Sequence, residues 1–122
     1  MLDHVGIQCA DLEASAAFYD AALAPLGFRR LMDVKVAIGY GADKPDFWIG
    51  VFDSGEGFRE SHLAFAAPDL AAVDAFFDAD VAAGAEVLHE PAVHSEYHEH
   101  YYGAFVRDPD GNNVEAVAHR PV

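Results

Sequence analysis

The chain has 122 residues, a hydrophobic fraction of 52% and a formal net charge of −14. A chain of this length forms one domain around one core, and its apolar content excludes a disordered chain. The negative charge argues against nucleic-acid and anionic-membrane partners, because each phosphate would meet net repulsion, and it is compatible with a cationic ligand.

The first predicted elements are a strand over residues 2–8 and a helix over 12–24. Asp11 is expected to cap this helix, since a short carboxylate side chain accepts hydrogen bonds from the free N–H groups of the first turn. Gly27 is expected to end it, after Pro25. Three strand-like runs follow, FRRLMDV, KVAIGYG and DFWIGVF.

The second half of the chain repeats the first. A shift of 58 residues places HLAFAAPDLAAVDAFFDA (62–79) under HVGIQCADLEASAAFYDA (4–21) with eight identities in eighteen positions. The second copy therefore predicts a strand over 61–66, a cap at Asp69, a helix over 70–83 ending at Gly84, and strands in AEVLHE, YYGAFVR and NVEAV. The expected fold class is α+β. A single domain of two tandem βαβββ units, about 1–55 and 60–120, forms a curved, mixed and largely antiparallel sheet with its helices outside.

Strand alternation predicts which side chains share a face. His4 lies opposite Val5 and Ile7, and His62 lies opposite Leu63 and Phe65. If the large apolar residues pack against the helices, both histidines face the open side. Equivalent first strands of a repeat lie near its pseudo-two-fold axis, so His4 and His62 are expected to approach one another. By the same argument Tyr102 and Ala104 share the open side if Phe105 packs against a helix.

Glu115 lies in the middle of the short apolar strand that follows DPDGNN. A carboxylate there is costly unless it is paired, protonated or bound to a metal. Two imidazoles and one carboxylate are a common ligand set for Zn²⁺ and for Fe(II), so His4, His62 and Glu115 are predicted metal ligands. The ion itself, Zn²⁺, Ni²⁺, Mn²⁺ or Fe(II), is left open.

The segment HSEYHEHYYG (94–103) is the candidate source of acid–base groups, because imidazole titrates near neutrality. His98, His100 and Tyr102 are the predicted catalytic residues, and a histidine-rich surface loop is the alternative. The pair His98-x-His100 also resembles a cupin motif, which the repeat argues against. The predicted substrate-binding residues are Trp48, Tyr101 and Phe52, whose side chains could line an aromatic wall.

Three motifs together resemble the vicinal oxygen chelate superfamily of glyoxalase I, extradiol dioxygenases, epimerases and bleomycin-resistance proteins. These motifs are LDHVGI, SHLAFAAPDL and YYGAFVRDPDGNNVEAV. The resemblance covers essentially the whole chain. It implies that the positions of His4, His62 and Glu115 are metal ligands and that the protein is a homodimer. It leaves open whether one site lies within a chain or between two chains.

One position departs from glyoxalase I, which has a fourth carboxylate ligand on the last strand of its first unit. Aligning DKPDFWIGV with DGNNVEAVA places Trp48 opposite Glu115, and Trp48 cannot bind a metal. True glyoxalase I activity is therefore not expected.

Two functional hypotheses remain. The first is a metal-dependent lyase, isomerase or dioxygenase that binds a small substrate through adjacent oxygens. The second is a non-catalytic protein that sequesters a drug or aromatic metabolite. The single Cys9 cannot form an internal disulfide, and no run is apolar enough for a signal peptide or a membrane span, so a cytoplasmic location is expected.

Overall fold

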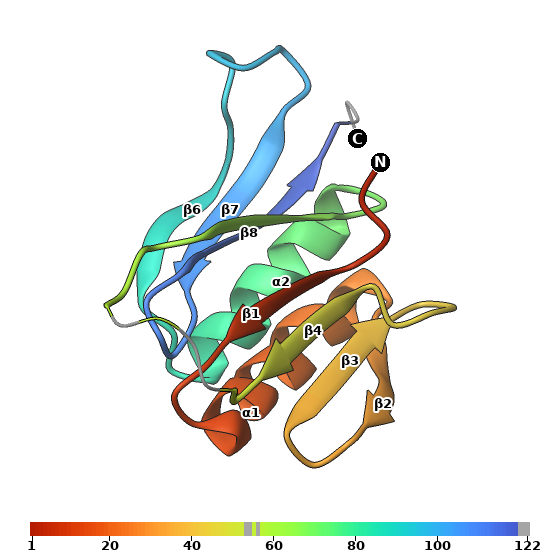
Figure 1. Cartoon of the computed structure of the whole chain (residues 1–122). Helices are drawn as coiled ribbons and strands as arrows, with labels where there is room; N and C mark the ends of the chain where they lie inside the picture. The colour runs from red at the N-terminus through yellow and green to blue at the C-terminus, as the bar shows by residue number, and fades with distance from the viewer. Residues whose placement is uncertain (53–54, 56, 120–122) are drawn as a thin grey trace.

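The computed structural model describes residues 1–52, 55 and 57–119, and its elements follow the predicted order of two βαβββ units (Figure 1). The first unit contains β1 (Val5–Gln8), α1 (Leu12–Leu23), a 3₁₀ turn (Ala24–Leu26), β2 (Arg29–Asp33), β3 (Ala37–Gly41) and β4 (Phe47–Gly50). The second contains β5 (His62–Ala66), α2 (Leu70–Ala82), β6 (Val87–Val93), β7 (Tyr102–Arg107) and β8 (Asn113–Ala118).

The predicted helix ends are confirmed. Oδ1 of Asp11 accepts from the N–H of Ala14 at 3.1 Å, and Oδ1 of Asp69 accepts from Ala72 at 2.8 Å. Gly27 and Gly84 follow the helical segments with φ of 90° and 87°. Glycine adopts this left-handed conformation without steric cost, and so the chain can leave the helix there.

The strands form two four-stranded sheets, one from each unit. Sheet A has the order β1-β4-β3-β2 and sheet B the order β5-β8-β7-β6. In each sheet the first strand of the unit pairs in parallel with the last, and the remaining pairs are antiparallel. The two sheets therefore repeat the same mixed topology, as the internal repeat predicts.

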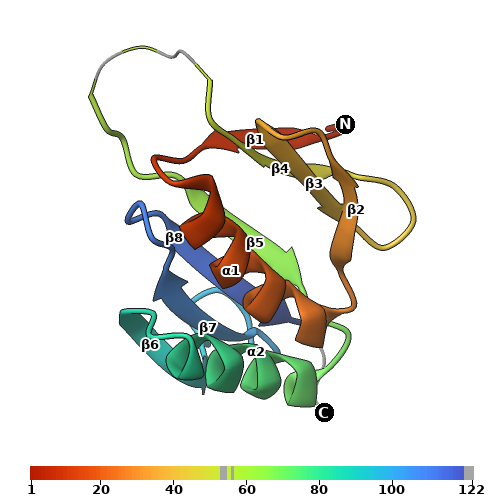
Figure 2. The ribbon, with the colours of Figure 1, turned by 90° about the horizontal axis from the view of Figure 1, so that it is seen from below.

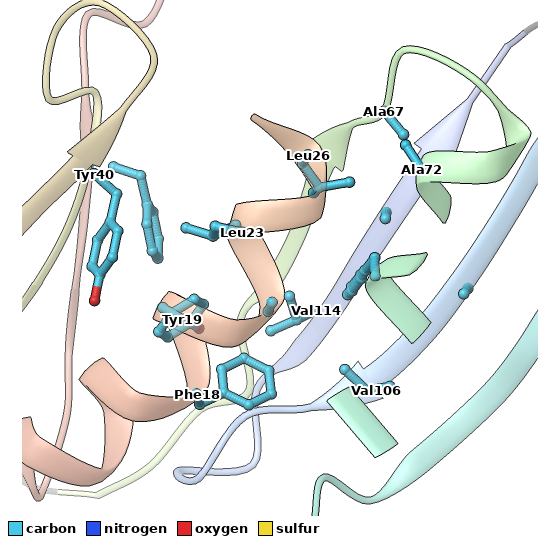
Figure 3. Packing of buried hydrophobic residues seen from close by; sticks show 14 of the residues in the cluster. Phe18, Tyr19, Leu23, Leu26, Tyr40, Ala67, Ala72, Val106 and Val114 are labelled. Carbon is cyan, nitrogen blue, oxygen red and sulfur yellow. The ribbon is translucent and has the colours of Figure 1, made fainter. Parts of the chain in front are cut away.

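The hydrophobic core lies between the two sheets. Figure 2 shows α1 between sheet A and sheet B, and Figure 3 shows its side chains Tyr19 and Leu23 between Tyr40 of sheet A and Val114 of sheet B. The rings of Phe47 (β4) and Phe65 (β5) meet directly at 5.1 Å. Each sheet thus turns one face toward a common core, and its other face is open. Two sheets that share a core cannot also turn their open faces toward each other.

The turn between β7 and β8 joins the two units. Asp108 is buried, and its Oδ2 accepts from the hydroxyl of Tyr19 at 2.7 Å and from the amide of Asn112 at 3.0 Å. Asp110 accepts from the backbone N–H of Ala10 at 3.0 Å. Burial and Asp108 raise the pKa of Tyr19, which keeps its hydroxyl a donor. These bonds hold α1 against the turn that leads into Glu115.

Asp80 of α2 is a second buried carboxylate, outside the open faces. It is fully buried, and neither of its oxygens has a hydrogen-bond partner in the described part of the chain. Burial raises its pKa to about 8. The carboxyl is therefore held protonated at neutral pH, since an unpaired charge there would be costly.

We expect Asp80 to make the protein less stable as the pH rises. Its pKa is higher in the folded chain than in the unfolded chain, so the folded state binds the proton more tightly. Its contribution to the free energy of unfolding then falls from about pH 4 to about pH 8, by at most about 1.4 kcal/mol per pH unit. Denaturant titrations of Asp80→Asn should lack this fall. Asp78 is exposed on the same helix, so the control variant Asp78→Asn should lose stability with rising pH as the wild type does. An Asp80→Asn variant with the pH dependence of the wild type would contradict the assignment.

Candidate functional site

One row of side chains crosses the open face of sheet B. The strand register places Ala64 (β5) opposite Glu115 (β8), Glu115 opposite Phe105 (β7), and Phe105 opposite His89 (β6). Residues paired in this way point to the same face of a sheet. His62, two residues before Ala64, belongs to this face as well. The predicted orientation of His62, opposite Leu63 and Phe65, is confirmed by the alternating burial of β5.

Glu115 is only 1% exposed, and each of its two oxygens has its own partner. Oε1 lies 2.8 Å from Nε2 of His62, and Oε2 accepts from the hydroxyl of Tyr101. Burial and Glu115 raise the pKa of Tyr101, so the phenol stays protonated as a donor. No lysine or arginine of the described residues pairs with this carboxylate. The imidazole of His62, which is about half exposed, is thus the one group beside Glu115 that can carry positive charge.

Three imidazole rings surround Phe105, the residue of β7 that pairs with Glu115. The rings of His62, His89 and His94 stand edge-on to Phe105, with centroids at 6.0, 5.4 and 5.3 Å. The sequence did not predict His89 as a site residue. A bulge in β6 shifts the strand register next to His89, and this register decides that His89 lies opposite Phe105. A lone histidine on a strand gives no signal that would have identified it.

The predicted histidines His98 and His100 lie in the turn that precedes β7. Nδ1 of His98 accepts from the backbone N–H of His100 at 3.1 Å, so Nε2 of a neutral His98 carries the proton. That nitrogen lies 2.7 Å from Nδ1 of His119, and the two rings stack. His119 is exposed and pairs with His98. The catalytic roles of His98 and His100 stay predictions.

Tyr102 does not lie on the open face. Its hydroxyl donates to Asp74 of α2 at 2.7 Å, and this bond raises its pKa to about 12. Ala104 is fully buried in the core, while Phe105 lies on the open side opposite Glu115. The predicted face of Tyr102 and Ala104 is therefore wrong. The reason is that Phe105 is covered by imidazoles and not by a helix.

His4 does not join His62 within one chain. It is exposed just before β1 of sheet A, and its Nδ1 lies 2.8 Å from Asp3. Among residues 1–52, 55 and 57–119, no three His, Cys, Asp or Glu side chains are grouped so that they could bind a metal ion. The expectation that His4 and His62 approach one another is wrong for a single chain, because the shared core separates the open faces of the two sheets.

Trp48 occupies the place in sheet A that Glu115 occupies in sheet B. Trp48 pairs with Gly6 on β1, just as Glu115 pairs with Ala64 on β5, and Gly6 and Ala64 are themselves equivalent in the repeat. The alignment of Trp48 with Glu115 is therefore confirmed. Gly39 makes room for the indole, since a Cβ there would lie 2.9 Å from its ring.

The predicted aromatic residues are divided between the two sheets. Phe52 follows β4, is 55% exposed, and its N–H donates to Gln8 at 2.9 Å. Trp48 and Phe52 thus belong to sheet A, and Tyr101 to the Glu115 site on sheet B. A surface groove of about 690 Å³ lies elsewhere, between α1, the end of α2 and the turn at 108–111, and no predicted site residue lines it.

Comparison with known proteins identifies the family. The model of the Glyoxalase/Bleomycin resistance protein/Dioxygenase superfamily matches residues 1–116. The chain belongs to this superfamily. The crystal structure of a glyoxalase/bleomycin resistance protein from Albidiferax ferrireducens T118 is 34% identical, with a TM-score of 0.82 over 95% of this chain and 97% of that one.

Two further relatives are more distant. The uncharacterized protein YqjT of Bacillus subtilis (strain 168) is 28% identical over 96% of this chain and 98% of its own. The structure of a lactoylglutathione lyase from Agrobacterium tumefaciens is 20% identical, with a TM-score of 0.69 over 97% of this chain and 92% of that one. This last likeness shows the fold alone. Neither helix of the described chain is long and apolar enough to cross a membrane.

The donors of the superfamily site fit a divalent cation only in part. An imidazole nitrogen and a carboxylate oxygen stand 2.8 Å apart at His62 and Glu115. Neighbouring ligand atoms at right angles, each about 2.1 Å from a small divalent ion, lie about 3 Å apart. This pair therefore suits two adjacent positions of a metal site. Among residues 1–52, 55 and 57–119, no third His, Cys, Asp or Glu side chain joins this pair.

Proposed function

We propose that this superfamily member is a metal-dependent enzyme, of the lyase, isomerase or dioxygenase type, that acts on a small molecule with two adjacent oxygens. His62 and Glu115 would bind the divalent cation, and His4 of a second copy of the chain would complete the site. The observation that carries the proposal is the burial of Glu115, which is 1% exposed and has no lysine or arginine partner among the described residues. A bound cation would compensate the cost of burying this charge.

The open face supports a second copy as the source of His4. His62, Ala64 and Ala66 are exposed on β5, so a partner can reach the pair from outside. His4 is itself exposed, on the other sheet. A two-fold dimer in which each sheet A covers the sheet B of its partner would form two identical sites. The net charge of −14 also raises the local concentration of cations around each site.

The chemistry then divides between the cation and the chain. A divalent cation with three protein ligands acts as a Lewis acid toward substrate oxygens at its open positions. Phe105 holds the imidazole of His62 in place from the side. His89, exposed on the same row, is a further candidate for acid–base chemistry, in addition to the predicted His98 and His100.

Metal content tests this proposal directly. We expect about one divalent ion per chain in wild type, purified or reconstituted with Zn²⁺, Ni²⁺, Mn²⁺ or Fe²⁺, and its loss in Glu115→Gln and His62→Ala. Glutamine preserves the shape of the buried side chain and its bond to Tyr101 but removes the charge. Glu90→Gln, at an exposed position of β6, is the matched control and should keep its metal. Mass spectrometry of the dialysed proteins gives the counts. A wild type that takes up none of the four ions would exclude the proposal.

As a second candidate, we propose a non-catalytic binder of a flat, cationic aromatic compound on sheet A. Trp48 lies over Gly39 on that open face, Phe52 is exposed just after β4, and the chain is strongly acidic. Trp48 is the only tryptophan of the chain, so its fluorescence reports this face alone. Quenching by the planar cation ethidium that persists in excess EDTA would favour the binder. Fluorescence unchanged by ethidium would count against it.

A further inference from the structure

The two oxygens of Glu115 are held by different partners. Oε1 lies beside Nε2 of His62, at 2.8 Å, on the exposed side of the pair. Oε2 accepts from the hydroxyl of Tyr101. One oxygen is thus directed toward the predicted cation, and the other is occupied by a donor from the same chain.

The chain fixes Tyr101 before any ligand binds. The N–H of His94 donates to the carbonyl of Tyr101 at 2.8 Å, and the N–H of Tyr101 donates to the carbonyl of His98 at 3.2 Å. These bonds close the turn between β6 and β7. The paired rings of His98 and His119 then pack edge-on against the phenol ring, with centroids at 5.6 and 5.2 Å. Tyr101 is therefore restrained by both its backbone and its ring.

A glycine two residues later keeps space for this bond. A Cβ at Gly103 would lie 3.0 Å from Oε2 of Glu115 and 3.4 Å from Cε1 of Tyr101. A contact of 3.0 Å is closer than carbon and oxygen normally approach in proteins, so any larger residue would displace the carboxylate or the phenol. The φ angle of Gly103 is not positive, so the backbone does not require glycine at this position. The lack of a side chain instead leaves space for the Tyr101–Glu115 bond.

From these contacts we infer that Tyr101 is a positioning residue that makes Glu115 a one-oxygen ligand. The inference rests on the proposed metal site. By engaging Oε2, the phenol prevents the carboxylate from rotating to offer both oxygens to one cation, and Oε1 stays beside His62. A carboxylate that uses one position leaves more positions for the two oxygens of a substrate. Partners that orient a ligand in this way typically contribute a factor of about 10 to 100 in metal affinity.

The test compares two tyrosines that are adjacent in sequence and lie on opposite faces of sheet B. Tyr101→Phe removes the hydroxyl that donates to Glu115, whereas Tyr102→Phe removes one that donates to Asp74, away from the site. Dissociation constants for Zn²⁺ and Co²⁺ are measured by competition with a chelator. We expect Tyr101→Phe to bind both ions about 10- to 100-fold more weakly and Tyr102→Phe to bind them as wild type does. The visible absorption of bound Co²⁺ should change in Tyr101→Phe and not in Tyr102→Phe, since the spectrum reports the coordination number and geometry of the ion, which a second carboxylate oxygen would alter.

Gly103→Ala provides a second variant, which keeps the hydroxyl of Tyr101 but crowds Oε2 of Glu115. Thermal unfolding of each variant without metal shows whether it is folded. Weaker binding by folded Gly103→Ala is expected as well. If wild type binds Zn²⁺ and Co²⁺ and folded Tyr101→Phe binds them equally well with the same Co²⁺ spectrum, the inference is overturned and the metal site stands. If Tyr101→Phe does not fold, wild-type affinity in Gly103→Ala overturns it. A wild type that binds neither ion refutes the metal site and the inference with it.

Discussion

The burial of the Glu115 carboxylate shapes the open face of sheet B. A carboxylate that is 1% exposed in an apolar strand needs compensation, and the described chain offers one imidazole and one phenol but no permanent cation. Several otherwise separate features follow from it. Gly103 leaves room for the carboxylate, Phe105 holds the imidazole, and the turn at 94–101 supplies the phenol.

The duplicated unit explains why one chain holds only part of the predicted ligand set. Both sheets use one face to enclose α1 and the common core, so their open faces are separated. His4 and Trp48 belong to the open face of sheet A, and His62 and Glu115 to that of sheet B. The two copies have diverged at equivalent positions, because Trp48 stands where the second unit has Glu115. In the proposed metal site, His4 of a second copy of the chain is therefore the third ligand.

Local signals predicted the local structure well. The capping aspartates, the terminating glycines and the order of the strands were all readable, because each depends on a few neighbouring residues. Strand parity also placed His62 correctly. It failed at β7, since the rule that a large apolar residue packs inward assigned Phe105 to the core, whereas imidazoles from β5, β6 and the turn at 94–101 cover it. The positions of His89, Tyr101 and His4 depend on sheet register and on the relation between the sheets, which a single sequence does not specify.

In the proposed dimer, His4 of one chain completes the His62–Glu115 pair of the other. The most direct measurement is the metal content of a mixed dimer of differently tagged His4→Ala and Glu115→Gln chains, purified by both tags. Each parent homodimer lacks a ligand in both sites, whereas the mixed dimer has one site with all three ligands. We expect about one divalent ion per mixed dimer and almost none in either parent. A mixed dimer without metal, or a His4→Ala homodimer that keeps its metal, would contradict it.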